Sequence, residues 1–549
     1  MTEAAVQKKP YVRRLAEAVF VDLYRQFRWS YLPPLMVYFA AGISGLTAIV
    51  GTFFVKEYLG LSAAFLAGLA FWAGIPWALK MPMGHLVDLI WRWKGALIFL
   101  GAGLVTASLM IMFALIAYTD DMVAIMPISA WYVLSVLLAP SGYVIQDSVA
   151  DAMSVEAVPR HAPDGTPLGE AETKALHTTM QTLGRIALIG GLVFVASLNI
   201  FMFAGVEEMS QDDKAAVYAR IYLTALAIPV ISVSGVFLAS VMKARRRRAL
   251  RQRGMSAEEI DAAVDRPVEE VEINWWYFIG GGLFVALTLL VGLSDIAFSQ
   301  EIVFAGSMAI VLVLMQQLIA VLDKAHARAL IGTAIIIFVF RAVPLPGAGA
   351  TWFSIDVLGF DQQFLSILSL IASMLTLAGM IVLRPLIATK TITHIVVLLT
   401  IAAGILSLPN IGLYYGIHHW TGPLTGGVVD ARFIALIDTA IESPLGQIAM
   451  IPMLAWIAKN APFELKATFF AVMASFTNLA LSASSLLTKY LNQIFVVTRE
   501  VRDRVTGEIV TSADYGSLGW LLIVVAATSV VAPLITIAIV QLTVFHTEE

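Results

Sequence analysis

Residues 127–153 read PISAWYVLSVLLAPSGYVIQDSVADAM, an apolar run long enough to cross a bilayer that ends with two carboxylates. Asp147 and Asp151 lie four residues apart, so on a helix they project from the same face. A carboxylate at the centre of a membrane helix costs about 2.5–3.5 kcal/mol, so such groups usually face a partner or a watery cavity. The pattern predicts a helix that lines a transport pathway. The alternative is an acidic pair at the cytoplasmic end, in contact with lipid headgroups or basic residues.

The composition of the whole chain is that of a membrane protein with many spans. Of the 549 residues, 59% are hydrophobic and 13% are charged, and the mean hydropathy is +0.83. The formal net charge of -4 is spread over many short loops and gives no sign of a nucleic-acid surface. The chain has no cysteine, which excludes disulfides, thiolate metal sites and a cysteine nucleophile.

Apolar runs of about 20 residues predict fourteen membrane spans. Six lie near residues 33–55, 61–80, 95–117, 125–153, 173–202 and 218–242. Eight more lie near residues 275–293, 301–322, 329–350, 360–387, 393–416, 432–458, 465–490 and 516–543. Basic residues, including the run KARRRR at 243–248, gather in the loops on one side of this count. That side should be cytoplasmic, so we expect an integral protein of a bacterial inner membrane with both termini in the cytoplasm.

We expect four parts along the chain: a cytoplasmic segment with a surface helix at residues 1–32, an N-terminal six-helix bundle at 33–242, a cytoplasmic linker with two extra membrane helices at 243–328, and a C-terminal six-helix bundle at 329–549. The surface helix is predicted from apolar residues at four-residue spacing: Leu15, Val19, Leu23 and Phe27. Residues 496–515 alternate valines with charges around Thr506-Gly507 and predict an outward β-hairpin.

The loop after the second span carries Gly84, Asp88 and Arg92. A small residue allows helices to approach closely, and the acid can cap the N-terminus of a neighbouring helix. The spacing resembles the G-x-x-x-D-R-x-G-R-R loop of the major facilitator superfamily, although Leu89 stands where that loop has its first Arg. We therefore expect a structural role for this loop.

Longer stretches resemble the folate-biopterin transporter family. They are VYFAAGISGL (37–46), FFVKEYLGLS (53–62), IPWALKMPMGHLVD (75–88), IQDSVADAMSVE (145–156), FRAVPLPGAGATWFSIDVLGFDQQFLSILS (340–369) and IPMLAWIAKNAPFELKATFFAVMASFTNLA (451–480). Lys466 stands where the family usually has an acid, and Ala461 replaces its usual Cys. The resemblance implies an all-α integral membrane protein with the major facilitator fold of two six-helix bundles. It does not cover the hairpin or the pair of helices in the linker, so the count of apolar runs alone predicts an inserted pair of transmembrane helices between the bundles.

The predicted fifth span carries a polar stripe of Lys174, His177, Gln181 and Arg185, which share one helical face. Arg185 lies eleven residues from Lys174, or roughly 16 Å along a helix, which is near the middle of the membrane. We expect its planar fork to face a central cavity near Asp147 and to bind an anionic or heterocyclic substrate. The alternative is an Arg–Asp clamp that only holds the N-terminal half together.

Five buried polar candidates lie in the C-terminal half: Arg341, Asp438, Glu442, Gln447 and Asn478. Asp438 and Glu442 are four residues apart on one predicted helix. A salt bridge from Arg341 to either acid is the structural alternative, and it could serve as an outer gate. Asn478 can instead hold helices together. No metal site is expected, because His418 and His419 lack further ligands nearby.

The residues and the resemblance together predict a secondary active transporter that moves a pteridine, folate or related aromatic compound with protons by alternating access. Asp147 is the predicted proton carrier, and Arg185 is predicted to hold the substrate or to pair with Asp147. No G-x-x-x-x-G-K-[ST] loop occurs, so an ATP-driven pump is not expected, and we expect no cofactor and no enzymatic activity. The expected partners are substrate, protons and membrane lipid. The alternative is a transporter-shaped assembly or pigment-binding protein whose protein partner docks on residues 275–322.

Overall fold

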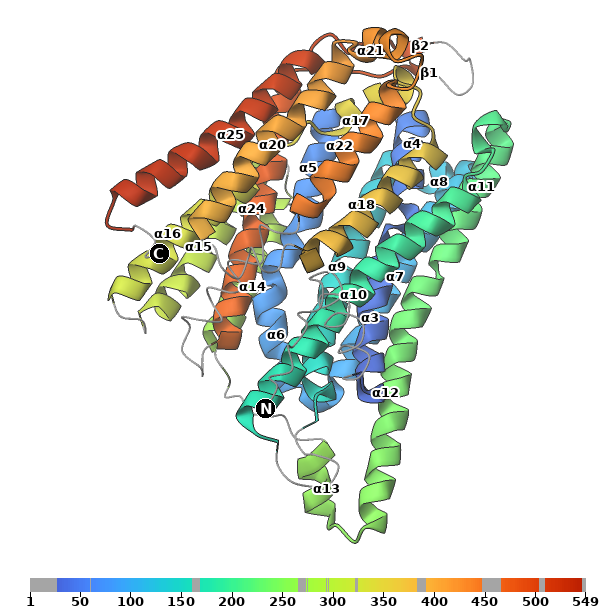
Figure 1. Cartoon of the computed structure of the whole chain (residues 1–549). Coiled ribbons are helices and arrows are strands. Elements are labelled where there is room, and N and C mark those ends of the chain that lie inside the picture. The colour runs from blue at the N-terminus through green and yellow to red at the C-terminus, as the bar shows by residue number, and fades with distance from the viewer. Residues whose placement is uncertain are drawn as a thin grey trace, which may run out of the picture.

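The computed structural model describes residues 27–545, apart from residue 60, 160–167, 265–272, 274, 293, 295, 321–323, 383–391, 447–465 and 503–508. Figure 1 shows a bundle of long helices. One end carries the short helix α13 (Ala257–Val264), and the opposite end carries the strands β1 (Val501–Arg502) and β2 (Ile509–Thr511). We call these ends the linker side and the hairpin side. The surface helix predicted before residue 27 lies outside the described residues.

The N-terminal half contains six membrane-length segments, two of which are helices broken by 3-10 turns. They are α3 (Leu32–Gly42) with α4 (Ala48–Tyr58), α5 (Ala63–Gly74) with α6 (Lys80–Leu89), α7 (Lys94–Ala117), α9 (Ile128–Ala157), α10 (Glu170–Met202), and α11 (Gln211–Ala225) with α12 (Ala227–Gln252). The short helix α8 (Thr119–Ile125) connects α7 to α9. Figure 1 shows α12 running toward α13 past the ends of its neighbours.

The inserted pair and the C-terminal half follow. The inserted helices are α14 (Trp275–Gly292) and α15 (Ser299–Ile319). The C-terminal half has α16 (Lys324–Ala342), α17 (Ala348–Asp356), α18 (Gln362–Val382), α20 (Ile392–Tyr414), α21 (His418–Leu424), α22 (Ala431–Gly446), α24 (Lys466–Ile494) and α25 (Leu518–Leu542).

A helix or a broken helix lies at each of the fourteen predicted spans. Within the described residues, ten helices are long and apolar enough to cross a membrane, and the bent pair formed by α5 and α6 makes an eleventh. The other three predicted spans correspond to α16, α22 and α24, and the span of α22 leads into residues outside the described part. The chain is therefore an all-α integral membrane protein.

Small residues let neighbouring helices approach closely, which is how helices pack in a lipid environment that offers little hydrophobic driving force. A Cβ atom on Gly142 of α9 would lie 2.5 Å from the carbonyl oxygen of Gly101 in α7. Next to this contact, Ser108 and Ser135 hydrogen-bond across the same two helices at 3.0 Å. A larger side chain at Gly142 would therefore push α7 and α9 apart.

The two halves meet along two helix pairs, α5 with α24 and α10 with α18. The first pair shares an apolar cluster that includes Phe71 from α5, Ile75 from the turn that follows α5, and Met473, Phe476 and Leu479 from α24. Helix α15 packs against both α5 and α24, and α14 packs against α15 and α6. The inserted pair therefore lies at the seam between the two halves.

The break between α16 and α17 follows from the sequence VPLPG at residues 343–347, because proline removes a backbone donor and disfavours a helical residue before it. Gly347 has a φ of 77°, which favours glycine. Side chains of α24 bind the backbone that the break frees: Ser484 Oγ donates to the carbonyl of Val343 at 2.6 Å, and the N–H of Leu345 donates to Thr488 Oγ1 at 2.9 Å. Such bonds make a broken helix tolerable at membrane depth.

Where the sequence predicts a hairpin, β1 and β2 pair in antiparallel fashion. An isolated bridge between Thr498 and Asp514 extends the contact toward the membrane helices. The predicted turn at Thr506-Gly507 lies outside the described residues.

Candidate functional site

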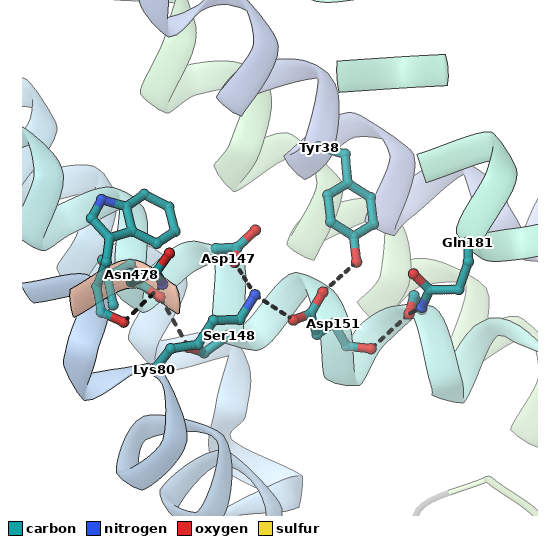
Figure 2. Close-up of polar contacts among 10 residues, drawn as sticks. Tyr38, Lys80, Asp147, Ser148, Asp151, Gln181 and Asn478 are labelled. Atoms are coloured by element: carbon teal, nitrogen blue, oxygen red, sulfur yellow. Dashed lines mark hydrogen bonds and ion pairs between the residues drawn. The ribbon is translucent and has the colours of Figure 1, made fainter. Parts of the chain in front are cut away.

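Four side chains form a polar cluster within the N-terminal half, and we call Tyr38, Lys80, Asp147 and Asp151 the carboxylate cluster. The Nζ atom of Lys80 lies 2.5 Å from Oδ2 of Asp147 and 2.9 Å from Oδ2 of Asp151. The hydroxyl of Tyr38 donates to Oδ1 of Asp151 at 2.7 Å. Figure 2 shows the ammonium group of Lys80 between the two carboxylates, with Tyr38 approaching from α3. The two aspartates that the sequence placed on one helical face thus share a single ammonium group.

The local fold of three helices sets these positions. Lys80 is the first residue of α6 and directly follows the 3-10 turn Ile75–Leu79, whose second residue is Pro76. Asp147 and Asp151 lie in the half of α9 nearer the linker side. The α24 residue Asn478 donates to the carbonyl of Trp77 at 3.2 Å, so the C-terminal half holds the turn that positions Lys80. This contact agrees with the helix-packing alternative for Asn478.

Exposure differs across the cluster. The side chains of Lys80 and Asp147 are 26% and 17% exposed, whereas that of Asp151 is 45% exposed. One ammonium and two carboxylate groups leave one formal negative charge in excess. Asp147 is therefore the more enclosed acid, and Asp151 is the one that solvent reaches more easily.

The predicted stripe on α10 faces this region only in part. Gln181 Nε2 donates to Ser154 Oγ at 3.3 Å, and Ser154 in turn donates to the carbonyl of Asp151 at 2.7 Å. Arg185 is exposed and near enough to Asp147 for electrostatic attraction, but the described residues contain no ion pair between them. The side chains of Lys174 and His177 lie outside the described part of the structure.

In the C-terminal half, Asp438 is buried and accepts a hydrogen bond from Asn410 Nδ2 at 2.8 Å. Arg341 forms no ion pair with Asp438 in the described part of the chain. Its Nη1 atom is buried and has no hydrogen-bond partner among the described residues. The side chain of Glu442, the second acid predicted for this region, is not among those described.

The predicted structural loop lies at the linker side. Arg92 forms an ion pair with Asp261 of α13 at 2.7 Å. Asp88 lies in α6, close enough to Lys94 to interact electrostatically. A Cβ atom added to Gly84 would meet nothing within 4 Å in the described part of the chain, so close helix approach is not its role in this conformation.

Sequence reasoning missed Lys80 and Tyr38. Both lie in stretches whose family resemblance is plain, and a lone lysine in the apolar run IPWALKMPMG carried a signal of its own. The predicted span ended at residue 80, which placed Lys80 at the membrane surface. The structure instead continues through α6 to Leu89, which brings Lys80 well inside the segment.

A second polar cluster joins the two halves at the hairpin side, and we call Lys56, Asp356, Arg499 and Tyr515 the hairpin-side cluster. Lys56 Nζ of α4 lies 2.6 Å from Asp356 Oδ1 of α17, and the hydroxyl of Tyr515 donates to Asp356 at 2.6 Å. Arg499 donates to the carbonyl of Leu59, which follows α4. Burial lowers the pKa of Arg499 to about 10, so the guanidinium stays protonated at neutral pH.

Comparisons with known proteins agree with this architecture. The model of the BT1 family matches residues 41–547. A folate-biopterin transporter from Synechocystis sp. is 22% identical over 472 residues, which cover 84% of this chain and 75% of the relative.

Solved structures share the fold. A POT family transporter in complex with 5-aminolevulinic acid has a TM-score of 0.59 at 11% identity, over 93% of this chain and 96% of that one. The inward-open xylose transporter XylE from E. coli has a TM-score of 0.50 at 12% identity, over 96% of this chain and 98% of that one. Likeness at these identities shows the fold alone, and it is the major facilitator fold.

Proposed function

Because the chain belongs to the BT1 family, with a match over residues 41–547, we propose that it is a proton-coupled secondary transporter of a pteridine- or folate-like compound. The family is one of membrane transporters and not of enzymes. The substrate class comes from the Synechocystis relative, whose name specifies folate and biopterin. At 22% identity the relative supports a class of compound and not a particular one.

The carboxylate cluster is the observation that carries the proton-coupling part of the proposal. It has one negative charge in excess, and an uncompensated charge within a membrane segment is costly. A proton is the smallest species that removes this charge. Protonation of Asp147 breaks its 2.5 Å ion pair with Lys80, so proton binding is linked to the contact between α6 and α9.

The contacts between the halves support alternating access. The hairpin-side cluster and the bond from Gln362 Nε2 to the Tyr218 hydroxyl, 2.9 Å long, join the two halves at that side. Asp151 meanwhile keeps a solvent-exposed side chain. We take the linker side as cytoplasmic, because the basic run at 243–248 lies there. The conformation is then closed on the outer side, with protons exchanged on the cytoplasmic side.

Arg185 is assigned to substrate binding. It is an exposed guanidinium near the middle of α10, and no ion pair engages it among the described residues. Its fork can bind a carboxylate or the polar edge of a heterocycle. The absence of a described pair with Asp147 favours this role over an internal clamp.

Counterflow in liposomes tests the transport proposal. Purified protein is reconstituted into liposomes loaded with unlabelled folate or unlabelled biopterin, and uptake of the labelled compound is followed. We expect transient accumulation of at least one compound, absent from protein-free liposomes. A protein that shows no counterflow of either compound contradicts the proposed substrate class, and a pigment or stoichiometric protein partner in the purified sample favours the assembly alternative.

A further inference from the structure

Arg341 lies near the middle of a membrane segment. The broken span formed by α16 and α17 runs from Lys324 to Asp356, and Arg341 is 17 residues from its first residue and 15 from its last. It stands one residue before α16 ends and next to the non-helical stretch 343–347. A charge at this depth normally faces a partner or the transport pathway.

The neighbouring backbone is already bound by other groups. Ser484 and Thr488 of α24 bind Val343 and Leu345, and Asn492 Nδ2 donates to the carbonyl of Pro346 at 3.2 Å. These bonds hold the break against α24 without using the guanidinium. The Nη1 atom of Arg341 remains buried with no hydrogen-bond partner among the described residues.

The following acids, whose side chains the structure describes, have other partners. Asp147 and Asp151 bind Lys80, Asp438 accepts a bond from Asn410, Glu301 binds Lys489, and Asp356 binds Lys56. No ion pair of Arg341 occurs in the described part of the chain, so its charge is not balanced by any of these groups. A guanidinium has five N–H donors in a planar fork, and a carboxylate is the group that fits this fork with two parallel bonds.

We propose that Arg341 is the binding site for a carboxylate group of the transported compound. The inference rests on the proposed function and deepens it, because it divides the candidate substrates by charge. Folate carries carboxylates on its glutamate moiety, whereas biopterin has no carboxylate. Arg341 therefore selects compounds of the folate kind, and it contributes nothing to the affinity for a pterin without a carboxylate.

The experiment compares the binding of folate and biopterin to the purified full-length protein and to Arg341→Gln. Loss of a charge-assisted bidentate bond should weaken folate binding by roughly tenfold to a hundredfold. Biopterin binding should not change. Arg328→Gln is the matched control, because Arg328 is an exposed arginine on the same helix, and it should bind both compounds as the wild type does.

Two further measurements guard against a variant that simply misfolds. Arg341→Lys keeps the charge and lacks the fork, so it should remain folded and still bind folate more weakly than the wild type. The unliganded Arg341→Gln protein should melt no lower than the wild type, because the removed charge has no partner among the described residues. A lower melting temperature would reveal a structural partner and would contradict the proposal.

The outcomes separate this inference from the proposed function. Equal folate affinity of the wild type and Arg341→Gln overturns the role of Arg341 and leaves the transport proposal intact. An equal loss of folate and biopterin affinity also overturns the role of Arg341, because the arginine would then not bind the carboxylate that only folate carries. A wild-type protein that binds neither compound contradicts the proposed substrate class, and the inference falls with it.

Discussion

Lys80 holds two carboxylates that the chain places 67 and 71 residues away from it. Each aspartate carries a negative charge within a membrane segment, and the single ammonium group balances only one of them. The hydroxyl of Tyr38 adds a neutral donor to Asp151. Protonation of one carboxylate should remove one of the two ion pairs of Lys80, and such sensitivity to a single proton is the property that a coupling site needs.

Removing the ammonium group should destabilise the protein. Lys80→Met leaves Asp147 and Asp151 without their described ion-pair partner, and we expect a loss of about 1–3 kcal/mol, between the values for exposed and fully buried pairs. Unfolding of the purified protein in detergent measures the loss. The double variant Lys80→Met, Asp147→Asn has the same net charge in the cluster as the wild type and should regain part of the stability. A single variant as stable as the wild type would show that the ion pairs contribute nothing.

Replacement of Arg185 separates its two proposed roles. Arg185→Ala should weaken binding of folate by roughly tenfold through loss of a charged hydrogen bond. Its unliganded stability should stay within about 0.5 kcal/mol of the wild type, as for other exposed residues. Binding assays and melting curves measure the two effects, with the exposed Arg220 replaced by Ala as the control. Normal binding together with a large loss of stability would instead support the internal Arg–Asp clamp.

Two basic residues, Lys80 and Arg341, each lie beside a break in a membrane span. The 3-10 turn Ile75–Leu79 ends directly before Lys80, and the non-helical stretch 343–347 follows Arg341 closely. Prolines in both stretches allow the sequence to predict that the helix is interrupted there. Which side chains then meet across the break depends on helices distant in sequence, such as α9 and α24.

The inserted pair is tied to both halves near the hairpin side. Gln300 Nε2 donates to the carbonyl of Gly68 in α5 at 3.1 Å, whereas Glu301 binds Lys489 of α24 at 2.7 Å. The hydroxyl of Tyr490 also donates to Glu301, at 2.5 Å. The sequence predicted a helix pair outside the transport core, and these contacts place it at the seam of that core.

Deleting residues 275–322 and rejoining the linker should leave folate binding intact, since no bond from the described part of the pair reaches the carboxylate cluster or Arg341. The deletion should lower the melting temperature, because Lys489 loses its described partners Gln300 and Glu301 within a membrane helix. The same deletion combined with Lys489→Met should regain part of that loss. A well-folded deletion that binds no folate would show that the inserted pair lines the substrate site.

At the scale of the whole molecule, the fold followed from the sequence far better than the site did. The lengths of the apolar runs and the basic residues in the loops predict the membrane spans and their orientation. Stretches that resemble the transporter family, such as residues 145–156, indicate the fold. The pairing of Lys80 with Asp147 could not be predicted, because it depends on how α6 packs against α9. Nor could the sequence predict that Arg341 has no described partner, because this depends on which helices pack around it.

The hairpin-side cluster predicts a way to arrest the transporter. The chain contains no cysteine, so Lys56→Cys with Asp356→Cys introduces a single reactive pair across the two halves. The Lys56 ammonium and the Asp356 carboxylate meet at 2.6 Å, so a short crosslinker should join the two cysteines. Crosslinking should abolish counterflow of folate, and cleavage of a reducible crosslinker should restore it. Each single cysteine variant, treated in the same way, is the control, and unchanged counterflow in the crosslinked protein would contradict movement of the halves at this side.

Proton-driven uptake is the most direct test of the account. Liposomes containing the wild type should accumulate labelled folate against its gradient when a pH gradient is imposed, and those containing Asp147→Asn should not, although the variant folds and still exchanges folate at equal concentrations. Asp120→Asn, a change at an exposed acid of the hairpin side, should accumulate folate as the wild type does. If Asp147→Asn accumulates folate at the wild-type rate, the coupling proton is carried elsewhere and the role given to the carboxylate cluster is wrong.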